Sequence, residues 1–86
     1  MKYRSKFDIM CQILAVANNG SGITQTRLTY KAFLTFNQVK KFLGVLTEKE
    51  LVEYDGDSNT FKTTEKGLRL LRNYNQLEEL IKKNDE

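Results

Sequence analysis

The sequence predicts a small, mostly helical α+β fold in which three helices are followed by one β-hairpin and a long last helix. Three observations support this prediction. Apolar residues recur at helical spacing in four segments, N-capping residues precede these segments, and a turn-rich cluster at residues 55–59 separates two short β-patterned runs. With 86 residues and no internal repeat, the chain is expected to form one domain, or one domain with a tail.

The first helix is predicted over about residues 5–18. Ser5 and Asp8 fit the Ser-x-x-acid capping pattern that precedes an apolar run. The apolar arc covers more than half of this helix, as is typical of a helix at the centre of a fold. Its members are Phe7, Ile9, Met10, Ile13, Leu14, Val16 and Ala17. The Asn, Gly and Ser residues at 18–22 then favour a turn.

The next two helices are predicted to be joined by a very short turn. Thr24 is a suitable N-cap for a helix over residues 25–32, and Ile23 before it suggests a short strand or a hydrophobic staple. Thr35 and Gln38 form a capping box for a helix that ends near residue 49 or 50. The expected buried stripe of this helix is Phe36, Val39, Phe42, Leu43 and Leu46. Two such helices predict a helix-turn-helix.

A β-hairpin with strands at 51–54 and 60–63 follows, and Thr64 caps a last helix over residues 65–83. A hairpin directly after a helix-turn-helix is a wing. We therefore expect a winged helix-turn-helix domain over residues 1–64 and a C-terminal dimerisation helix over residues 65–86.

The last helix carries an apolar seam beyond the residues it needs to pack on its own domain. Leu68 and Leu71 suffice for that packing, whereas the remaining apolar residues follow a heptad spacing that predicts a coiled coil in a homodimer. The residues expected at the dimer interface are Leu70, Tyr74, Leu77, Leu80 and Ile81. The alternative is that the helix folds back on its own domain. Whether the helices of a coiled coil would run parallel or antiparallel stays open.

Composition excludes several classes of function. One cysteine allows no internal disulfide, and the absence of histidine disfavours a zinc site, so we expect no metal and no cofactor. Without a histidine, a glycine-rich phosphate loop or a nucleophile beside a base, the chain is not expected to be an enzyme. No apolar run approaches the roughly 20 residues of a membrane span. The N-terminus has the outline of a secretory signal, but residues 7–17 are amphipathic, which favours a cytoplasmic protein with a reduced Cys11.

The charge distribution indicates a polyanionic partner. Residues 1–47 carry seven basic residues and one acid, whereas residues 48–86 carry seven basic and ten acidic residues. Because the second helix of a helix-turn-helix enters the major groove, we expect double-stranded DNA there. Arg27 lies where the helix dipole disfavours a cation, which suggests a phosphate at that helix end. The expected DNA-binding residues are Gln25, Thr26, Arg27, Tyr30, Thr35, Asn37, Gln38, Lys40, Lys41, Gly44, Asn59 and Lys62.

Other interpretations stay open at this stage. Lys40 and Lys41 would also suit a solvated helix face, Arg27 would suit an ion pair, and Tyr30 would suit burial. An acidic wing loop with Asp55 and Asp57 would suit a protein-interaction adaptor that binds no DNA. A single-stranded nucleic-acid binder is disfavoured, because the phenylalanines at 7, 36, 42 and 61 have core spacing and leave no exposed stacking platform.

Two motifs resemble a small archaeal winged-helix family of DNA-binding, partly chromatin-associated proteins. The family pattern Lys-Thr-Arg-Ile-x-Tyr-x-Ala-x-Leu-Ser-Tyr is similar to Gln25-Thr26-Arg27-Leu28-Thr29-Tyr30-Lys31-Ala32-Phe33-Leu34-Thr35-Phe36, and Tyr-x-x-Thr-x-Lys-Gly is similar to Phe61-Lys62-Thr63-Thr64-Glu65-Lys66-Gly67.

The resemblance covers nearly the whole chain and implies a nucleoid location, with Arg27 at the DNA and an antiparallel coiled coil between the last helices of a dimer. The chain departs from the family at Gln25, which removes a lysine contact, and in its shorter last helix. Many relatives have glycine where Glu50 stands, so the preceding helix is expected to end differently.

Overall fold

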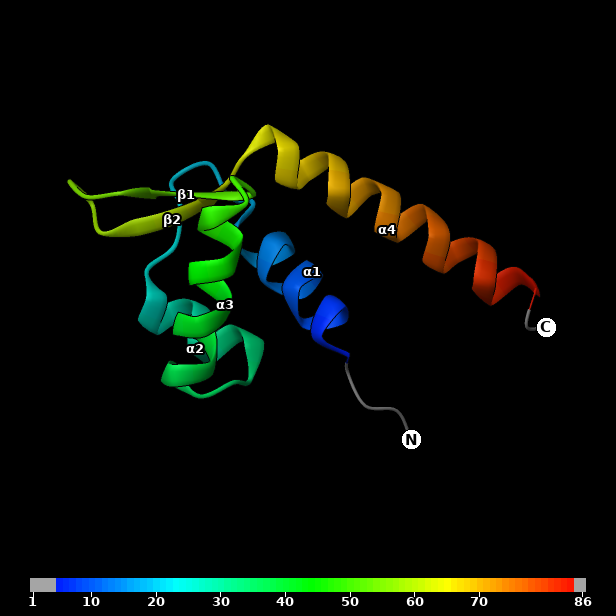
Figure 1. The fold of residues 1–86 in the computed structure, drawn as a ribbon, viewed down its shortest axis with the longest axis horizontal. Coiled ribbons are helices and arrows are strands. Elements are labelled where there is room, and N and C mark those ends of the chain that lie inside the picture. Colours follow the sequence, from blue (N-terminus) through cyan, green and yellow to red (C-terminus); the bar gives the residue numbers. More distant parts are fainter. Residues whose placement is uncertain (1–4, 85–86) are drawn as a thin grey trace.

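The computed structural model describes residues 5–84, except for the side chains of Glu78 and of residues 81–84. The predicted order of elements is correct, and each boundary lies within two residues of its expected position (Figure 1). The elements are α1 (Lys6–Ala17), α2 (Gln25–Ala32), α3 (Phe36–Glu48), β1 (Val52–Asp55), β2 (Thr60–Thr63) and α4 (Glu65–Asn84).

Side-chain caps fix the starts of the first three helices, as predicted. At α1, the Ser5 Oγ accepts from the Asp8 amide at 3.1 Å, and the Asp8 carboxylate accepts from the Ser5 amide at 3.2 Å. Thr35 and Gln38 form the same reciprocal pair at α3, at 3.2 and 3.0 Å. Thr24 caps α2 by accepting from the Arg27 amide at 3.2 Å.

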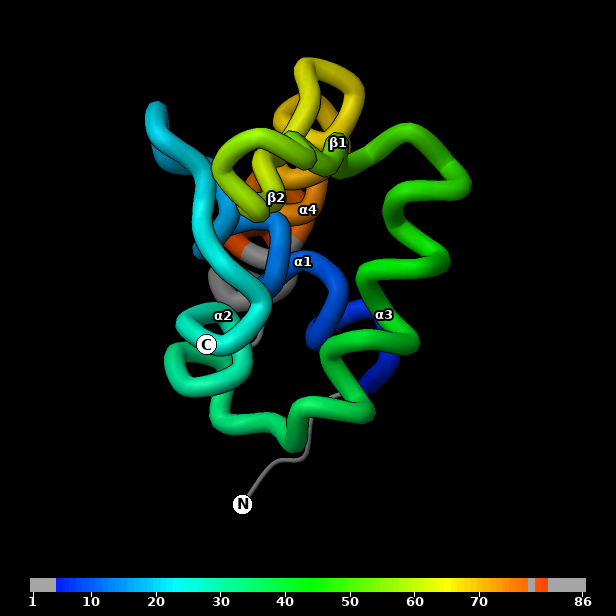
Figure 2. Tube along the Cα trace, turned by 90° about the vertical axis from the view of Figure 1, so that its left-hand side faces the viewer, coloured from blue at the N-terminus to red at the C-terminus, as the bar shows by residue number. Residues whose placement is uncertain are grey.

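The core surrounds α1, which lies between α2, α3 and the hairpin (Figure 2). Ile13 and Leu14 are fully buried against side chains from α2, α3 and the start of β1. These partners include Leu28, Val39, Leu43, Leu46, Leu51 and Val52. One member of the expected stripe is wrong: Phe36 is half exposed, because it lies in the first turn of α3 and projects past the edge of the core.

The hairpin gains a third, one-residue strand from the loop before α2. β1 and β2 pair antiparallel with Val52 opposite Thr63, and Ile23 exchanges two backbone hydrogen bonds with Phe61 at 2.9 and 2.7 Å. Gly22 approaches this site with a φ of 81°, and a Cβ there would lie 2.8 Å from the Thr60 Oγ1. The loop therefore ties the wing to the start of α2.

The end of α3 corrects an expectation. Glu50 adopts the left-handed conformation that usually favours glycine, with a φ of 64°. The Leu51 amide donates to the Leu46 carbonyl at 2.8 Å. This is the hydrogen bond of a Schellman motif that joins residues five apart in the sequence. The helix thus ends as it would with glycine, with a glutamate carrying the conformational cost.

Thr63 joins the hairpin to α1 through a buried hydrogen bond. Its Oγ1 donates to the Leu14 carbonyl at 2.7 Å, and Leu14 lies in the last turn of α1, where carbonyls lack a helical partner. We expect Thr63→Val to lower the free energy of unfolding by about 1–2 kcal/mol, because it leaves this carbonyl buried and unpaired. Urea unfolding would measure the change, with the exposed Thr47→Val as control. Equal stability of the two variants would contradict the account.

The first half of α4 packs on its own domain. Leu70 and Leu71 contact the core cluster. Tyr74 donates to the Asp8 carboxylate at 2.6 Å and meets the Phe7 ring edge-on, with centroids 5.4 Å apart. The Tyr74 hydrogen bond, with help from the Ser5 amide, lowers the pKa of Asp8. The helix therefore folds back on α1 as far as Tyr74, as the alternative interpretation had it.

The second half of α4 extends away from the domain (Figure 1). Leu77 and Leu80 are 57% and 59% exposed. Of the five residues expected at a dimer interface, Leu70 packs on the core cluster and Tyr74 contacts α1 of the same chain, while the side chain of Ile81 lies outside the described residues. A division of the chain at residue 64 remains a proposal about the role of α4.

Candidate nucleic-acid interface

The outer face of α3 presents one continuous polar stripe. Val39, Leu43 and Leu46 turn inward, so that the residues between them face solvent. The exposed polar residues are Asn37, Gln38, Lys40, Lys41, Thr47 and Glu48, with Gly44 among them, and the apolar Phe36 and Val45 are exposed as well. Every expected site residue on this helix is therefore accessible, and Glu48 adds one acid at the far end of the stripe.

Two of the expected site residues are already engaged in folding. Thr35 and Gln38 bond to each other's backbone in the capping box. Gln25 has a related role, since its Nε2 donates to the Phe36 carbonyl at 3.4 Å and so links the first turns of α2 and α3. Asn37, Lys40 and Lys41 are the residues of α3 best placed to meet a partner.

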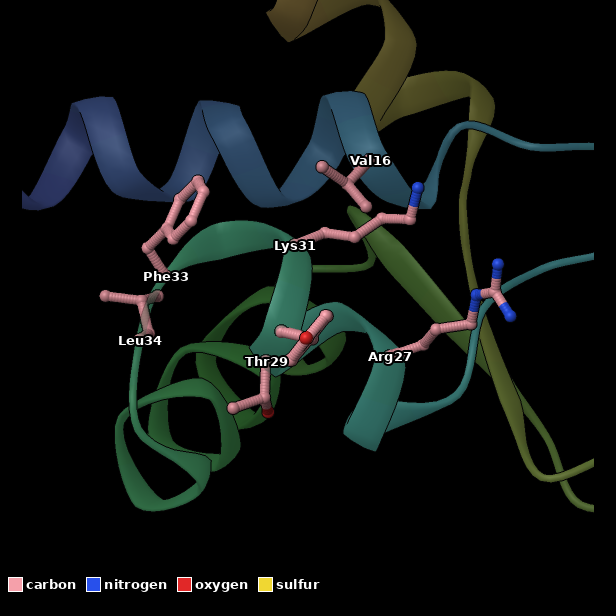
Figure 3. Close-up of a pocket in the computed structure, with 7 residues that line it drawn as sticks. Val16, Arg27, Thr29, Lys31, Phe33 and Leu34 are labelled. Atoms are coloured by element: carbon pink, nitrogen blue, oxygen red, sulfur yellow. The ribbon is translucent and has the colours of Figure 1, made fainter.

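Arg27 lies in the first turn of α2 with its side chain exposed. Figure 3 shows its guanidinium extending away from the helix, on the same side as the Lys31 amine. Both residues line a polar hollow whose other walls include Ser21, Thr24 and Thr60. Within the described side chains no ion pair joins Arg27 to a carboxylate, so the ion-pair interpretation gains no support. A cation in the first turn of a helix, as at Arg27, suits a phosphate.

The wing offers less to an anion. Lys62 is exposed on β2, directly opposite Glu53 in the hairpin register. The Asn59 side chain accepts from the Tyr54 hydroxyl at 2.5 Å and its backbone has a φ of 58°, so it serves the turn. Asp55 accepts from the Asp57 amide at 3.0 Å within the same loop. The wing tip is therefore acidic, and the side-chain oxygen of Asn59 is already bonded to Tyr54.

Between α3 and the wing lies an open, mainly apolar groove. Gly44 lies on its α3 side, Tyr54 and Phe61 line its hairpin side, and Gln25 and Lys40 stand at its edge. The two rings pack against each other at 4.9 Å between centroids. The sequence pattern did not reveal this groove, because it joins residues from four elements.

Gly44 lowers the stability of α3, and nothing in the fold requires a glycine at this position. It lies inside an exposed helix, where glycine is about 1 kcal/mol less favourable than alanine. A Cβ at this position would meet nothing within 4 Å. We expect Gly44→Ala to raise the free energy of unfolding by about 0.5–1 kcal/mol while weakening the binding of a partner that approaches the helix backbone. Thermal unfolding and a binding titration would measure the two effects, and a stabilised variant with unchanged binding would contradict this role.

The exposed Phe33 ring near the helix-turn-helix was missed from the sequence, whereas Tyr30 was already among the expected DNA-binding residues. Tyr30 and Phe33 are each 84% exposed, so Tyr30 is not buried under the domain. With Phe36 half exposed, the expectation that no aromatic platform exists is wrong. The signal available in the sequence was position: Tyr30 faces away from Leu28 and Ala32 on α2, and Phe33 occupies the turn itself.

Other kinds of site find no support in the described part of the chain. Among the side chains that the structure describes, no cluster of acidic or cysteine groups could bind a metal ion. Among the helices described, none is long and apolar enough to span a bilayer. Cys11 is buried in α1.

Comparisons with known proteins agree with this geometry. A family model described as winged helix-turn-helix matches residues 3–82. Among solved structures, a mutant of ZitR from Lactococcus lactis superposes with a TM-score of 0.68 at 18% sequence identity. The alignment covers 99% of this chain and 64% of that chain, so the likeness concerns the fold over part of a longer protein. No curated protein matches the sequence.

Proposed function

The chain belongs to the winged helix-turn-helix family, and from this premise we propose that it binds double-stranded DNA through the exposed faces of α2 and α3, as a transcription regulator or a nucleoid-type architectural protein. One observation carries the proposal: the segment from residue 9 to residue 47 contains four basic residues and no acid, and all four are exposed. A stretch of exposed cations with no acid before Glu48 suits phosphate contacts.

In this proposal the stripe on α3 enters the major groove. Asn37 suits the edge of adenine, and Lys40 and Lys41 suit guanine or phosphate. Arg27 and the hydroxyls around it hold a backbone phosphate beside the start of α2. The acidic wing tip then stays away from the DNA backbone, while Lys62, at the base of the wing, contacts that backbone. Such a protein works in the cytoplasm, on the nucleoid.

The experiment is a binding titration with fluorescently labelled random duplex DNA at about 50 mM and about 200 mM salt. We expect binding that weakens steeply with salt. Selection from a random-sequence library then separates the two roles, because a regulator enriches one site and an architectural protein enriches none. Absence of binding both to random duplex and in the selection would overturn the proposal.

We also propose that the protein acts as a homodimer through the distal part of α4. Leu77 and Leu80 are more than half exposed and lie one turn apart, in the part of α4 that extends away from the domain (Figure 1). We expect Leu77→Glu/Leu80→Glu to give a folded monomer with at least tenfold weaker DNA binding, since two linked half-sites are lost. Sedimentation velocity would measure the mass, with Asn75→Glu/Gln76→Glu as the control of equal charge. A monomeric wild type would contradict this proposal.

A protein-interaction adaptor is the second candidate, and the acidic wing favours it. Glu53, Asp55 and Asp57 are exposed on one short hairpin. An adaptor would bind a basic partner through this wing and would bind no DNA. The duplex titration and selection described above decide between the candidates.

A further inference from the structure

A second surface of the helix-turn-helix combines exposed aromatic rings with cations. It is formed on the outer side of α2 by Arg27, Tyr30, Lys31 and Phe33, and we call it the aromatic surface. The Tyr30 and Phe33 rings are 84% exposed, so their flat faces are accessible. Figure 3 shows Phe33 at the C-terminal end of α2, with Arg27 and Lys31 extending from the body of the helix.

The fold does not account for a phenylalanine at position 33. This residue ends α2 in the left-handed conformation, with a φ of 57° and a ψ of 46°, where glycine is the usual choice. The capping hydrogen bonds to the Thr29 and Tyr30 carbonyls come from the Phe33 backbone and need no side chain. The position therefore carries backbone strain and an exposed apolar ring at once, which points to a use for the ring.

The charges around the rings indicate the partner. Arg27 and Lys31 lie one turn apart on the same helix, and no acidic residue occurs between residues 9 and 47. Cations that track a phosphate backbone, interleaved with accessible aromatic faces, are the two features by which proteins hold single-stranded nucleic acid. An apolar protein partner would match the rings but would leave both cations without a counterpart.

We propose that Tyr30 and Phe33 stack on unpaired bases of single-stranded nucleic acid, while Arg27 and Lys31 bind its phosphates. This activity is additional to duplex binding. The proposed duplex contacts do not use the two rings, and Arg27 is the residue that both activities share. The rings and the stripe on α3 belong to one helix-turn-helix. Both activities are therefore available to a nucleic acid in which a duplex adjoins a single-stranded segment.

Fluorescence anisotropy with labelled oligo(dT) of about 20 nucleotides tests the proposal. The variant Tyr30→Ala/Phe33→Gly suits a helical site and a left-handed site respectively, so it keeps the fold, and circular dichroism verifies this. We expect it to bind oligo(dT) about 100-fold more weakly, from roughly tenfold per stacked base. Phe33→Tyr keeps a ring and should retain binding. Tyr54→Ala removes a half-exposed ring from the wing and is the matched control.

A parallel titration with duplex DNA separates this proposal from the first. Loss of oligo(dT) binding with duplex binding retained supports the aromatic surface as an independent site. Three results would overturn it: no oligo(dT) binding by the wild type at about 50 mM salt, equal oligo(dT) affinity of the folded double variant, or a change in self-association with oligo(dT) binding intact. The last result would assign the rings to a protein interface.

Discussion

Replacing Gly67 by alanine is expected to lower the free energy of unfolding by about 2–3 kcal/mol. Gly67 lies in the first turn of α4, where the helix passes closely over the start of the hairpin. A Cβ there would clash with the Leu51 carbonyl oxygen and would lie 2.7 Å from the Thr63 Cγ2. The carbonyl cannot move away freely, because it accepts from the Thr64 amide at 3.0 Å.

Thermal unfolding followed by circular dichroism measures this effect. For a chain of this size the loss corresponds to a fall in Tm of roughly 10–20 °C. Gly44→Ala is the matched control, since it makes the same chemical change inside a helix where nothing lies within 4 Å. Opposite signs for the two variants are the expected pattern. A Gly67→Ala protein as stable as the wild type would show that α4 does not pack on the hairpin as described.

The largest expected effect on binding comes from removing three cations of the proposed DNA face together. At about 0.1 M salt, Arg27→Ala/Lys40→Ala/Lys41→Ala should bind duplex DNA about 100-fold more weakly or worse, because each phosphate contact releases counterions. The slope of log affinity against log salt should become shallower by about 3, at roughly 0.9 per phosphate. All three side chains are exposed, so the variant should stay folded.

A control of equal charge separates a local site from general attraction. Lys6→Ala/Arg69→Ala/Arg72→Ala also removes three exposed cations, but from α1 and α4. We expect this variant to lose much less affinity. Equal losses in both triple variants would mean that net charge, and not the α2 and α3 face, determines binding.

Local sequence rules predicted the elements well because the capping signals are unusually complete. Ser5, Thr24 and Thr35 each precede an apolar pattern and each accept the expected backbone amide. The loop residue Ile23 also formed the short strand that its position suggested. The prediction of a strand at 51–54 differed by one residue, because the Schellman motif at the end of α3 occupies Leu51.

The predictions were weaker wherever exposure depends on the arrangement of helices in space. Periodicity placed Phe36 in the core, but the buried stripe of α3 begins only at Val39. Tyr74 fits a heptad seam by spacing, yet it bonds to Asp8, which lies 66 residues away in the chain. Phe33 ends α2 in the left-handed conformation, and its ring is exposed to solvent. The helical spacing of apolar residues does not continue through a turn, so it could not predict this exposure.

The central claim, that α2 and α3 bind duplex DNA, is tested most directly by two-dimensional NMR of the labelled protein titrated with a short duplex at about 50 mM salt. We expect the perturbed amides to lie in residues 25–31 and 36–47, with a smaller change at Lys62 and with α4 beyond Tyr74 unaffected apart from effects of dimerisation. Perturbations confined to the wing or to α4, or none at saturating duplex, would contradict it.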